Sequence, residues 1–313
     1  MRGTFIYIGQ RLVLIAVTTV LVSSIVFLLL HQIPGNAFLN ETRQSAQSLA
    51  AALHYYGLDL PLPQQYSNWV QGVVHGDLGE SLVNRGVKIT PLLIRETTVS
   101  ATVGFFALVV TIGLGLILGV VAALRQNTWV DYLASSASVV GYSIPSFVVA
   151  IFGLLIFGHY MYIWTQGSFF YSPGWGKPEQ IPVPALALGL PWASYVARIT
   201  RASMLEVIRT DYVRTAWAKG VRAQAVILRH ALRNALIPVV TILGPLITGL
   251  ITGSVVIENV FGIPGLGKEF VTSILARDYN IVIGVFTFYA ALVGLANLTV
   301  DVIYPALDPR IRY

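Results

Sequence analysis

Long apolar runs alternate with polar segments along this 313-residue sequence. A helix needs about 20 apolar residues to cross a bilayer core about 30 Å thick. Six runs come near this length: Leu12–Leu30, Val99–Val121, Ser138–Gly158, Ile181–Ile199, Leu236–Ile257 and Ile281–Tyr304. The pattern predicts an all-α, polytopic integral membrane protein with about six transmembrane helices.

Two of the six runs raise an alternative. The first follows Arg2 and Arg11, as a signal-peptide core would, but its 19 residues exceed the usual length of about 7–15 and no small-residue cleavage site follows. We therefore expect it to be a retained span. The fourth run contains three prolines, which membrane helices tolerate where neighbouring helices or water satisfy the freed carbonyls. We keep it as a span.

The composition agrees with a membrane protein and excludes several kinds of site. Hydrophobic residues make up 55% of the chain and charged residues 11%, against about 25% charged in soluble domains. The absence of Cys excludes disulfides and thiolate chemistry. The five His are far apart and lack metal-ligand spacing. We expect no catalytic residue, no metal and no cofactor bound by this chain.

Lys and Arg predict the orientation of the chain. The N-terminus, the tail, segment 122–137 and segment 200–235 with the adjoining Arg198 hold 13 of the 20 basic residues. The alternate segments hold 7 basic residues and 9 acidic ones. Because basic loops stay on the cytoplasmic side, we expect a multi-pass protein of the cell (inner) membrane with both termini cytoplasmic. The same basic excess gives little reason to expect a nucleic-acid partner in so apolar a chain.

The longest outer segment, residues 31–98, is predicted to be folded. Residues 42–56 form a short amphipathic piece, and a second helix follows the turn at Pro61 and Pro63, where apolar residues recur at helical spacing. Gly76 and Gly79 would end it. Two interpretations remain open: a cap that packs on the helix bundle, or a docking surface for an external partner.

One loop superficially resembles a phosphate-binding motif. Residues Gly262 to Lys268 fit the first seven positions of GxxxxGK, but Glu269 stands where Ser or Thr should bind magnesium. The loop is also predicted to lie outside the cytoplasm. We interpret it as a structural turn, so the chain has no nucleotide site of its own.

The predicted spans contain almost no ionisable residues. Ion-coupled carriers usually place such groups within the membrane, whereas Arg198 and Asp301 here lie near predicted cytoplasmic ends. The energy source is therefore expected elsewhere. A stand-alone channel or secondary carrier remains an alternative, because backbone carbonyls can also bind sodium.

The longest charged cytoplasmic segment is Glu206–Thr241. Eight basic residues fall between Arg198 and Arg233, and Gly220 divides two amphipathic helical stretches. After Gly220, one predicted apolar stripe contains Val221, Ala225, Leu228, Leu232 and Leu236. A basic hairpin lying on anionic lipid is one interpretation. A helix–turn–helix projection is the other, because glycine readily ends a helix in a left-handed conformation.

Several motifs in order resemble a known family. RTAWAKG (214–220) and RHALRNALIPVVT (229–241) resemble the cytoplasmic EAA-type loop of ABC importer permeases, most closely the oligopeptide/dipeptide branch. LDLPLPQQYSNWVQGVVHGDLGESL, GYSIPSF, IENVFGIPGLGK, ARDYNIVIG and DPRIR resemble that branch in the same order. The sequence departs from the loop pattern at Arg214, where Glu is usual, and at Arg233, where Pro is usual.

The resemblance implies a type I ABC importer permease fold and a set of partners. These are a second homologous permease subunit, two ATPase subunits that use ATP and Mg²⁺, an extracytoplasmic substrate-binding protein and the lipid bilayer. This chain would not be an enzyme. Its coupling loop would contact an ATPase through Tyr212, Val213, Arg214, Thr215, Ala216, Trp217, Lys219, Gly220 and Arg222. Docking of the binding protein would involve Trp69, Asp77, Glu80, Gly262, Pro264 and Gly267.

The resemblance also implies a division of the chain and a cargo. Residues 1–98 would hold the first span and the outer segment, 99–304 the transmembrane core with the coupling loop 200–235, and 305–313 a cytoplasmic tail. The implied cargo is short peptides. An importer of the same architecture for nickel chelate, glutathione or an oligosaccharide remains an alternative.

Overall fold

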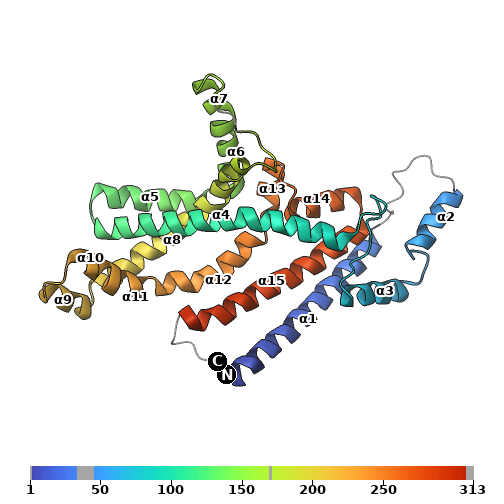
Figure 1. The fold of residues 1–313 in the computed structure, drawn as a ribbon, viewed down its shortest axis with the longest axis horizontal. Coiled ribbons are helices and arrows are strands. Elements are labelled where there is room, and N and C mark those ends of the chain that lie inside the picture. Colours follow the sequence, from blue (N-terminus) through green and yellow to red (C-terminus); the bar gives the residue numbers. More distant parts are fainter. Residues whose placement is uncertain (1, 34–45, 169–170, 308–313) are drawn as a thin grey trace. The chain divides into compact units, whose positions relative to one another are not determined.

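The computed structural model describes residues 2–33, 46–168 and 171–307, and helices make up almost all of its regular structure (Figure 1). The first helices are α1 (Arg2–Gln32), α2 (Ala46–Tyr55), α3 (Leu62–Val74), α4 (Ile89–Leu124), α5 (Trp129–Ser143), α6 (Ser146–Gly153), η2 (Leu154–Tyr160), α7 (Met161–Trp164) and η3 (Pro178–Gln180). The others are α8 (Pro182–Ile208), α9 (Asp211–Ala218), α10 (Ala223–Ala225), η4 (Val226–Leu232), α11 (Arg233–Ala235), α12 (Ile237–Ile251), α13 (Val255–Phe261), α14 (Leu266–Ala276) and α15 (Tyr279–Leu307).

Two compact units make up the chain. The first contains residues 1–99 and 264–298, and the second contains residues 100–263 and 299–312. The long helices α4 and α15 each contribute to both units. Each unit has its own apolar core.

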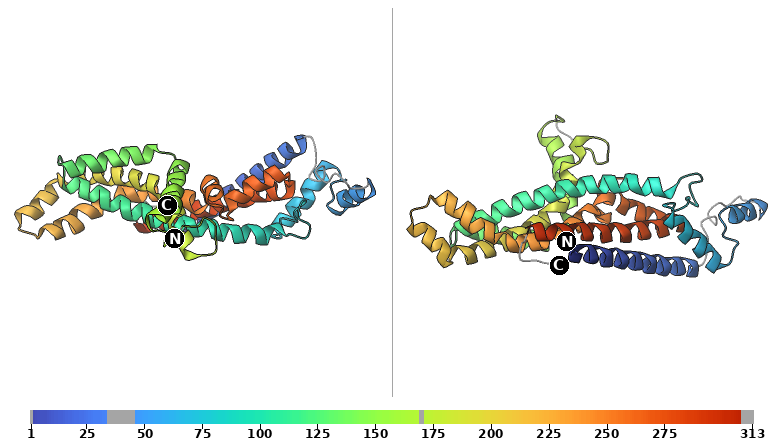
Figure 2. Two further views of the ribbon diagram at one scale, coloured as in Figure 1. Left: turned by 90° about the horizontal axis from the view of Figure 1, so that it is seen from above. Right: turned by 60° about the horizontal axis from the view of Figure 1, so that its bottom comes forward.

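The first unit is built on the pairing of α1 with α15, which lie side by side in Figures 1 and 2. Val26 and Phe27 of α1 pack on Val282 and Ile283 of α15. Many other large side chains of α1 are exposed, as expected of a helix that faces lipid.

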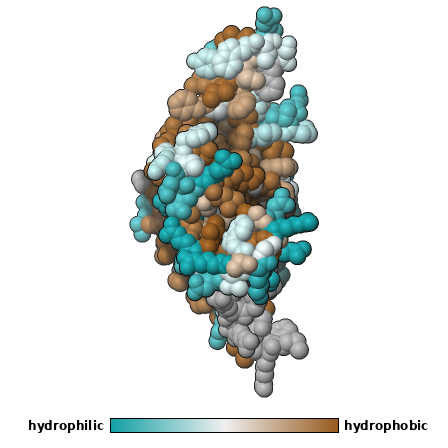
Figure 3. Space-filling view, turned by 90° about the vertical axis from the view of Figure 1, so that its left-hand side faces the viewer, coloured by the Kyte–Doolittle hydropathy of each residue, from teal (hydrophilic) through white to brown (hydrophobic). Residues whose placement is uncertain are grey.

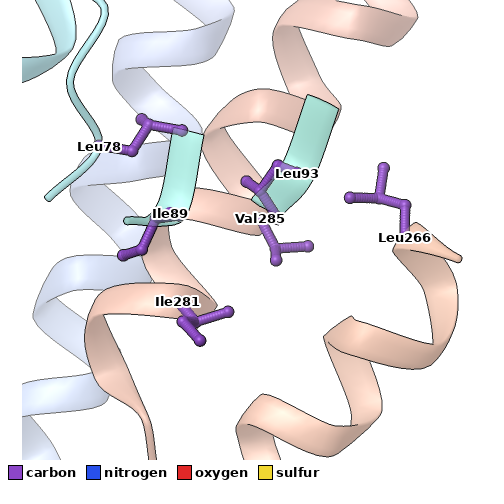
Figure 4. Close-up of a cluster of buried hydrophobic side chains, with 6 residues drawn as sticks. All are labelled: Leu78, Ile89, Leu93, Leu266, Ile281 and Val285. Atoms are coloured by element: carbon purple, nitrogen blue, oxygen red, sulfur yellow. The ribbon is translucent and has the colours of Figure 1, made fainter. Parts of the chain in front are cut away.

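A second cluster joins the outer segment to this pair. Leu78, Ile89, Leu93, Leu266, Ile281 and Val285 converge from the outer segment, α4, α14 and α15 (Figure 4). Trp69 and Val73 of α3 pack against it. The prediction of a helix after Pro61 that ends before Gly76 is confirmed, and its apolar face lies on the bundle. The amphipathic piece predicted for residues 42–56 appears as α2, with residues 42–45 outside the described part.

The second unit is organised around α8, whose buried face consists mainly of small residues. Small residues allow membrane helices to approach closely. A Cβ built at Gly119 of α4 would lie 2.6 Å from the carbonyl oxygen of Ala197 in α8. The two backbones are therefore in direct contact at this point.

The described residues contain four or five candidate membrane spans, close to the predicted number of about six, and the boundaries need correction. Four helices are long and apolar enough to cross a membrane, and a bent helix pair, Ala223–Ala235 with Ile237–Ile251, is a candidate fifth span. The fourth predicted run lies in α8, a 27-residue helix that contains Pro191. This helix is not among the candidate spans, so the fourth predicted run is not supported as a span by length and hydropathy.

Two predicted spans are divided in the structure. The run Ser138–Gly158 is broken at Ile144 and Pro145, so the candidate span is Ser146–Trp164 and α5 is a separate helix. Proline lacks the N–H that would continue the helical hydrogen bonds. The fifth run, Leu236–Ile257, is broken between α12 and α13, where Gly253 has a φ of 87°.

Candidate functional site

The segment that its charge predicts to be cytoplasmic forms a projecting helix–turn–helix. α8 continues past the predicted end of its span to Ile208, and the short helix α9 follows from Asp211 to Ala218. The chain then turns at Gly220 and returns through α10, η4 and α11 (Figure 1). We call residues 209–222 the knuckle.

Gly220 occupies the position at which a helix ends in a left-handed turn. Its φ is 70°, and the N–H groups of Gly220 and Val221 donate to the carbonyl oxygens of Trp217 and Ala216 at 3.0 and 3.3 Å. This pair of bonds is the Schellman motif, in which glycine is preferred because it has no Cβ. The predicted left-handed conformation at Gly220 is confirmed.

The inner face of the knuckle holds it to the returning chain. Val213 and Ala216 of α9 are buried against Val226 of η4, with Val207 and Val221 at the edges. Val213 has no exposed surface. Burial therefore removes Val213 and Ala216 from the surface that a partner could contact, although both were predicted as coupling residues.

The apolar stripe predicted after Gly220 does not coincide with the buried face of this segment. Leu228 is 59% exposed, whereas the buried residues are Val226, Ala231 and Ala235. The cause is the π-helical geometry of Val226–Leu232. A π-helix bonds each residue to the fifth one along, so a stripe calculated with the α-helical period drifts off the buried face.

The outer face of the knuckle is exposed and basic. Arg214, Thr215, Trp217, Lys219, Gly220 and Arg222 are all exposed. Tyr212 is 43% exposed, and its hydroxyl accepts a hydrogen bond from Asn234 Nδ2 at 2.7 Å. Figure 3 views the end at which α9 and α10 lie in Figure 1, and hydrophilic side chains gather on this face. The structure thus presents Tyr212 and Trp217 among basic side chains.

The base of the knuckle is fixed by an apolar cluster. Ala123 of α4 and Met204 of α8 pack with Ala231 and Ala235 of the returning helices. The cluster joins the ends of α4 and α8 that lie next to the returning helices. The returning helices η4 and α11 are therefore packed on α4 and α8.

A buried ion pair adds to this base, and the sequence analysis did not find it. Asp131 of α5 is buried and accepts two hydrogen bonds from Arg201 of α8, at 2.5 Å from Nε and 2.7 Å from Nη2. The N–H of Asn127 and the hydroxyl of Ser135 also donate to it. Hydrogen bonding from Arg201 is the main reason why the pKa of Asp131 falls from 3.8 to about 2.

Replacing Asp131 with Asn is expected to destabilise this unit by about 2 kcal/mol. Breaking a buried ion pair from one side costs about 3–5 kcal/mol, and the 30% exposure of Arg201 reduces that cost. Thermal unfolding of the purified protein measures the change. Because the pKa of Asp131 is depressed in the native state, its contribution to the free energy of unfolding is present above pH 3.8 and is lost as the pH falls towards 2.

The exposed pair Arg214–Asp211 supplies the control for this prediction. Arg214 Nη1 and Asp211 Oδ1 are 3.7 Å apart, and both side chains are largely exposed. Replacing Arg214 with Gln should change stability by less than about 0.5 kcal/mol. Equal losses in the two variants would contradict the structural role of Asp131.

Among the outer residues predicted for docking, Trp69 and Glu80 line the same cavity. Trp69 is half-buried between two apolar clusters and stacks on Tyr66. Glu80 forms an isolated β-bridge with Lys88. Asp77 is exposed and accepts a hydrogen bond from the N–H of Gly79. The packing of Trp69 also supports the cap interpretation of the outer segment.

The loop that resembles a phosphate-binding motif connects two helices. Gly262 has a φ of 68° and ends α13, and α14 begins at Leu266. This geometry confirms the interpretation as a structural turn. Gly262 and Pro264 are exposed, but Gly267 is buried in the first turn of α14, which removes it from a docking surface.

Asp278 is the main polar anchor of the outer segment, and the sequence analysis did not single it out. Its buried carboxylate accepts hydrogen bonds from the Ser81 hydroxyl at 2.5 Å and from the N–H groups of Leu82, Val83 and Ile281. Asp278 thereby caps the start of α15 while holding a segment almost 200 residues away. An Asp before a long apolar helix is a capping signal, but its distant partners have no sequence signal.

A second buried carboxylate corrects the expected boundary of the fifth span. Glu258 was expected at the start of an outer loop, but it lies in α13 with 2% exposure. The hydroxyl of Ser100 donates to its Oε1 at 2.7 Å. A buried carboxylate requires such a donor, so α13 belongs to the packed interior of its unit.

Comparison with known protein families identifies the chain. Residues 115–313 match the model of the binding-protein-dependent transport system inner membrane component, and residues 4–88 match the N-terminal model of such membrane components. The chain belongs to this family. The resemblance noted in the sequence is confirmed, and the chain is a permease of the ABC importer class.

Curated relatives within the family match along nearly the whole chain. The dipeptide transport system permease protein DppB of Bacillus subtilis is 39% identical over 98% of this chain and 97% of its own length. The oligopeptide transport system permease protein OppB of Escherichia coli is 38% identical over 95% of each chain. The relatives are thus named as permease proteins.

A solved structure confirms the fold of this binding-protein-dependent permease. The MetNI methionine ABC transporter in an inward-facing conformation aligns with a TM-score of 0.56 and 20% identity. The alignment covers 69% of this chain and 96% of the other. At this identity the likeness supports the predicted type I importer permease fold and carries no statement about cargo.

Proposed function

We propose that this chain forms part of the translocation pathway of an ATP-driven importer for short peptides. The observation that carries the proposal is the near full-length similarity to DppB and OppB, which are named for dipeptide and oligopeptide transport. The similarity includes most of the outer segment, where the N-terminal family model matches residues 4–88 and the relatives also align. We therefore favour peptides over nickel chelate, glutathione or an oligosaccharide.

The proposed coupling element is the knuckle around Gly220. Its exposed Trp217 offers an apolar anchor, and Arg214, Lys219 and Arg222 offer positive charge to acidic groups of an ATPase. The buried contact of Val213 with Val226 holds the knuckle to the returning helix, so we expect the two to move together. ATP and Mg²⁺ would be used by two partner subunits, so this chain would not itself be an enzyme.

The remaining parts of the proposal concern assembly and orientation. A second homologous permease subunit would complete the pathway, and an extracytoplasmic binding protein would deliver peptide to the outer segment. Both termini and the knuckle would lie in the cytoplasm, because the basic residues gather there. The membrane would be the inner, or cell, membrane.

Cargo selection in proteoliposomes tests the proposal. The chain is reconstituted with its permease partner, ATPases and binding protein, and ATP-dependent uptake of trialanine, nickel–histidine, glutathione and maltotriose is compared. We expect ATP-dependent uptake of trialanine above that of the other three. Uptake of one of the others without trialanine would overturn the peptide assignment, and uptake without ATP or an ATPase would indicate a channel or secondary carrier.

A further inference from the structure

The outer segment contains a cavity whose lining differs from the apolar clusters around it. The cavity has a volume of about 330 Å³, within the range of small-molecule sites. Its wall comes from the end of α1, the connection from α2 to α3, α3 itself, the start of α15 and the segment bridged between Glu80 and Lys88, here called the Glu80 hairpin. All these elements belong to the first unit.

The chemistry of the cavity suits an ammonium group. Aromatic rings of Phe27, Tyr56, Trp69 and Tyr279 line it, together with the carboxylate-bearing Glu80. Aromatic faces attract cations, and a carboxylate pairs with an ammonium through charge-assisted hydrogen bonds.

The backbone of Glu80 is fixed, and its carboxylate is available to pair with a ligand cation. The side chain of Asn280 donates to its backbone carbonyl at 2.9 Å, which fixes the hairpin against α15. Its carboxylate lies 3.4 Å from the Tyr55 hydroxyl, and none of the ion pairs found among the described residues includes Glu80. The pKa of Tyr56 is raised mainly by burial and then by the charge of Glu80, so that charge acts on the cavity wall.

A second cavity adjoins the first across a shared wall. Tyr55, Tyr56 and Glu80 line both cavities, and the second, of about 490 Å³, is also lined by Arg85. Arg85 is exposed and lies near Tyr56, whose pKa it lowers in opposition to Glu80. Glu80 therefore lines both cavities, whereas Arg85 lines the second cavity only.

The wall itself is pre-organised. The Tyr56 hydroxyl donates to the carbonyl of Ser81 at 3.1 Å, which ties α2 to the hairpin. His31, at the end of α1, lies 3.2 Å from the side-chain oxygen of Gln65. Gln65 in turn donates to the carbonyls of Leu58 and Leu60. A ligand would meet a surface that is already ordered, which lowers the entropic cost of binding.

We propose that these two cavities bind a short peptide with free ends, its ammonium group beside Glu80 and its carboxylate beside Arg85. An extended di- or tripeptide is about 7–10 Å long, which matches two adjoining cavities better than one. The inference rests on the proposed peptide cargo and adds to it a site on the permease that receives the peptide outside the membrane. Recognition of both free ends would select short peptides over longer chains.

Peptides with one blocked end test this site. The probes are trialanine, N-acetyl-trialanine and trialanine amide, and the sample is the assembled transporter in nanodiscs without binding protein, studied by calorimetry. We expect each blocked end to weaken binding about tenfold, or about 1.4 kcal/mol, because blocking removes a hydrogen bond to a charged group. In Glu80→Gln, acetylation should no longer weaken binding, whereas amidation still should. In Arg85→Gln, amidation should no longer weaken binding, whereas acetylation still should.

The exposed Asp59 provides a matched control in the same segment. It pairs with His54 at 2.8 Å and does not line either cavity. The Asp59→Asn variant should still bind trialanine more tightly than either blocked peptide. Equal binding of the three peptides to the unaltered transporter would overturn the proposal, and so would intact discrimination in Glu80→Gln.

Two further measurements distinguish a failure of this site from a failure of the proposed function. Peptide uptake by the complete transporter is measured in the same preparations. Uptake of trialanine without end discrimination would overturn the site while leaving the peptide importer in place. A loss of binding-protein association in Glu80→Gln, with discrimination unchanged, would assign Glu80 to docking and overturn the site.

Discussion

Replacement of Gly220 with valine is expected to reduce ATP-driven uptake at least tenfold while the protein still inserts and assembles. The left-handed backbone at Gly220 costs an ordinary residue about 1–2 kcal/mol, and a β-branched side chain is the least tolerated there. A Cβ at Gly220 would meet no atom within 4 Å, so the strain is in the backbone alone. The turn would distort, and the exposed face of α9 would be displaced from its proposed partner.

Asparagine at position 220 provides the matched control. It adopts the left-handed conformation more readily than other residues with a side chain. We expect Gly220→Asn to keep most of the uptake that Gly220→Val loses. Uptake and ATP hydrolysis are measured together in proteoliposomes, with membrane insertion checked by protein content. Normal uptake in the valine variant would contradict the role of the knuckle.

Replacement of Asp278 with alanine is expected to destabilise the outer segment by about 3–5 kcal/mol. The carboxylate accepts hydrogen bonds from one hydroxyl and three backbone N–H groups. A buried donor left without its acceptor costs about 1–3 kcal/mol. We expect faster amide exchange over residues 79–89 and lower uptake, because the segment loses its attachment to α15. Hydrogen exchange of the purified protein measures the first effect.

Asp77 is the control for this variant, because it lies in the same segment and is exposed. Its carboxylate accepts a hydrogen bond from the N–H of Gly79, two residues away. Asp77→Ala should leave exchange over residues 79–89 within about twofold of the unaltered protein. Similar exchange in the two variants would show that Asp278 is not the anchor.

Features with a local cause could be predicted from the sequence. The lipid-facing helices are long continuous apolar runs, so their length and hydropathy indicated spans. Gly220 could be interpreted because the end of a helix depends on only a few neighbouring residues. The helix after Pro61 was also found, since its apolar spacing and its flanking glycines lie within one short stretch.

Features that depend on distant contacts or unusual geometry could not be predicted in this way. The partners Ser81 and Asp278 are 197 residues apart, and the sequence contains no signal that joins them. Val213 resembled an exposed anchor because nothing nearby indicated which side of α9 faces Val226. The stripe after Gly220 failed because an α-helical period was applied to a π-helical segment. The break at Pro145 had a local signal, but the continuous apolar run outweighed it.

Labelling of a single introduced cysteine tests the central claim most directly. The chain contains no Cys, so Lys219→Cys on the exposed face of the knuckle gives one unique thiol. Lys88→Cys on the outer segment is the control. We predict that maleimide labelling at position 219 is slowed at least tenfold when the ATPase subunits are assembled, whereas labelling at position 88 is unchanged. Equal labelling rates at position 219 with and without the ATPases would contradict the claim that the knuckle is the coupling element.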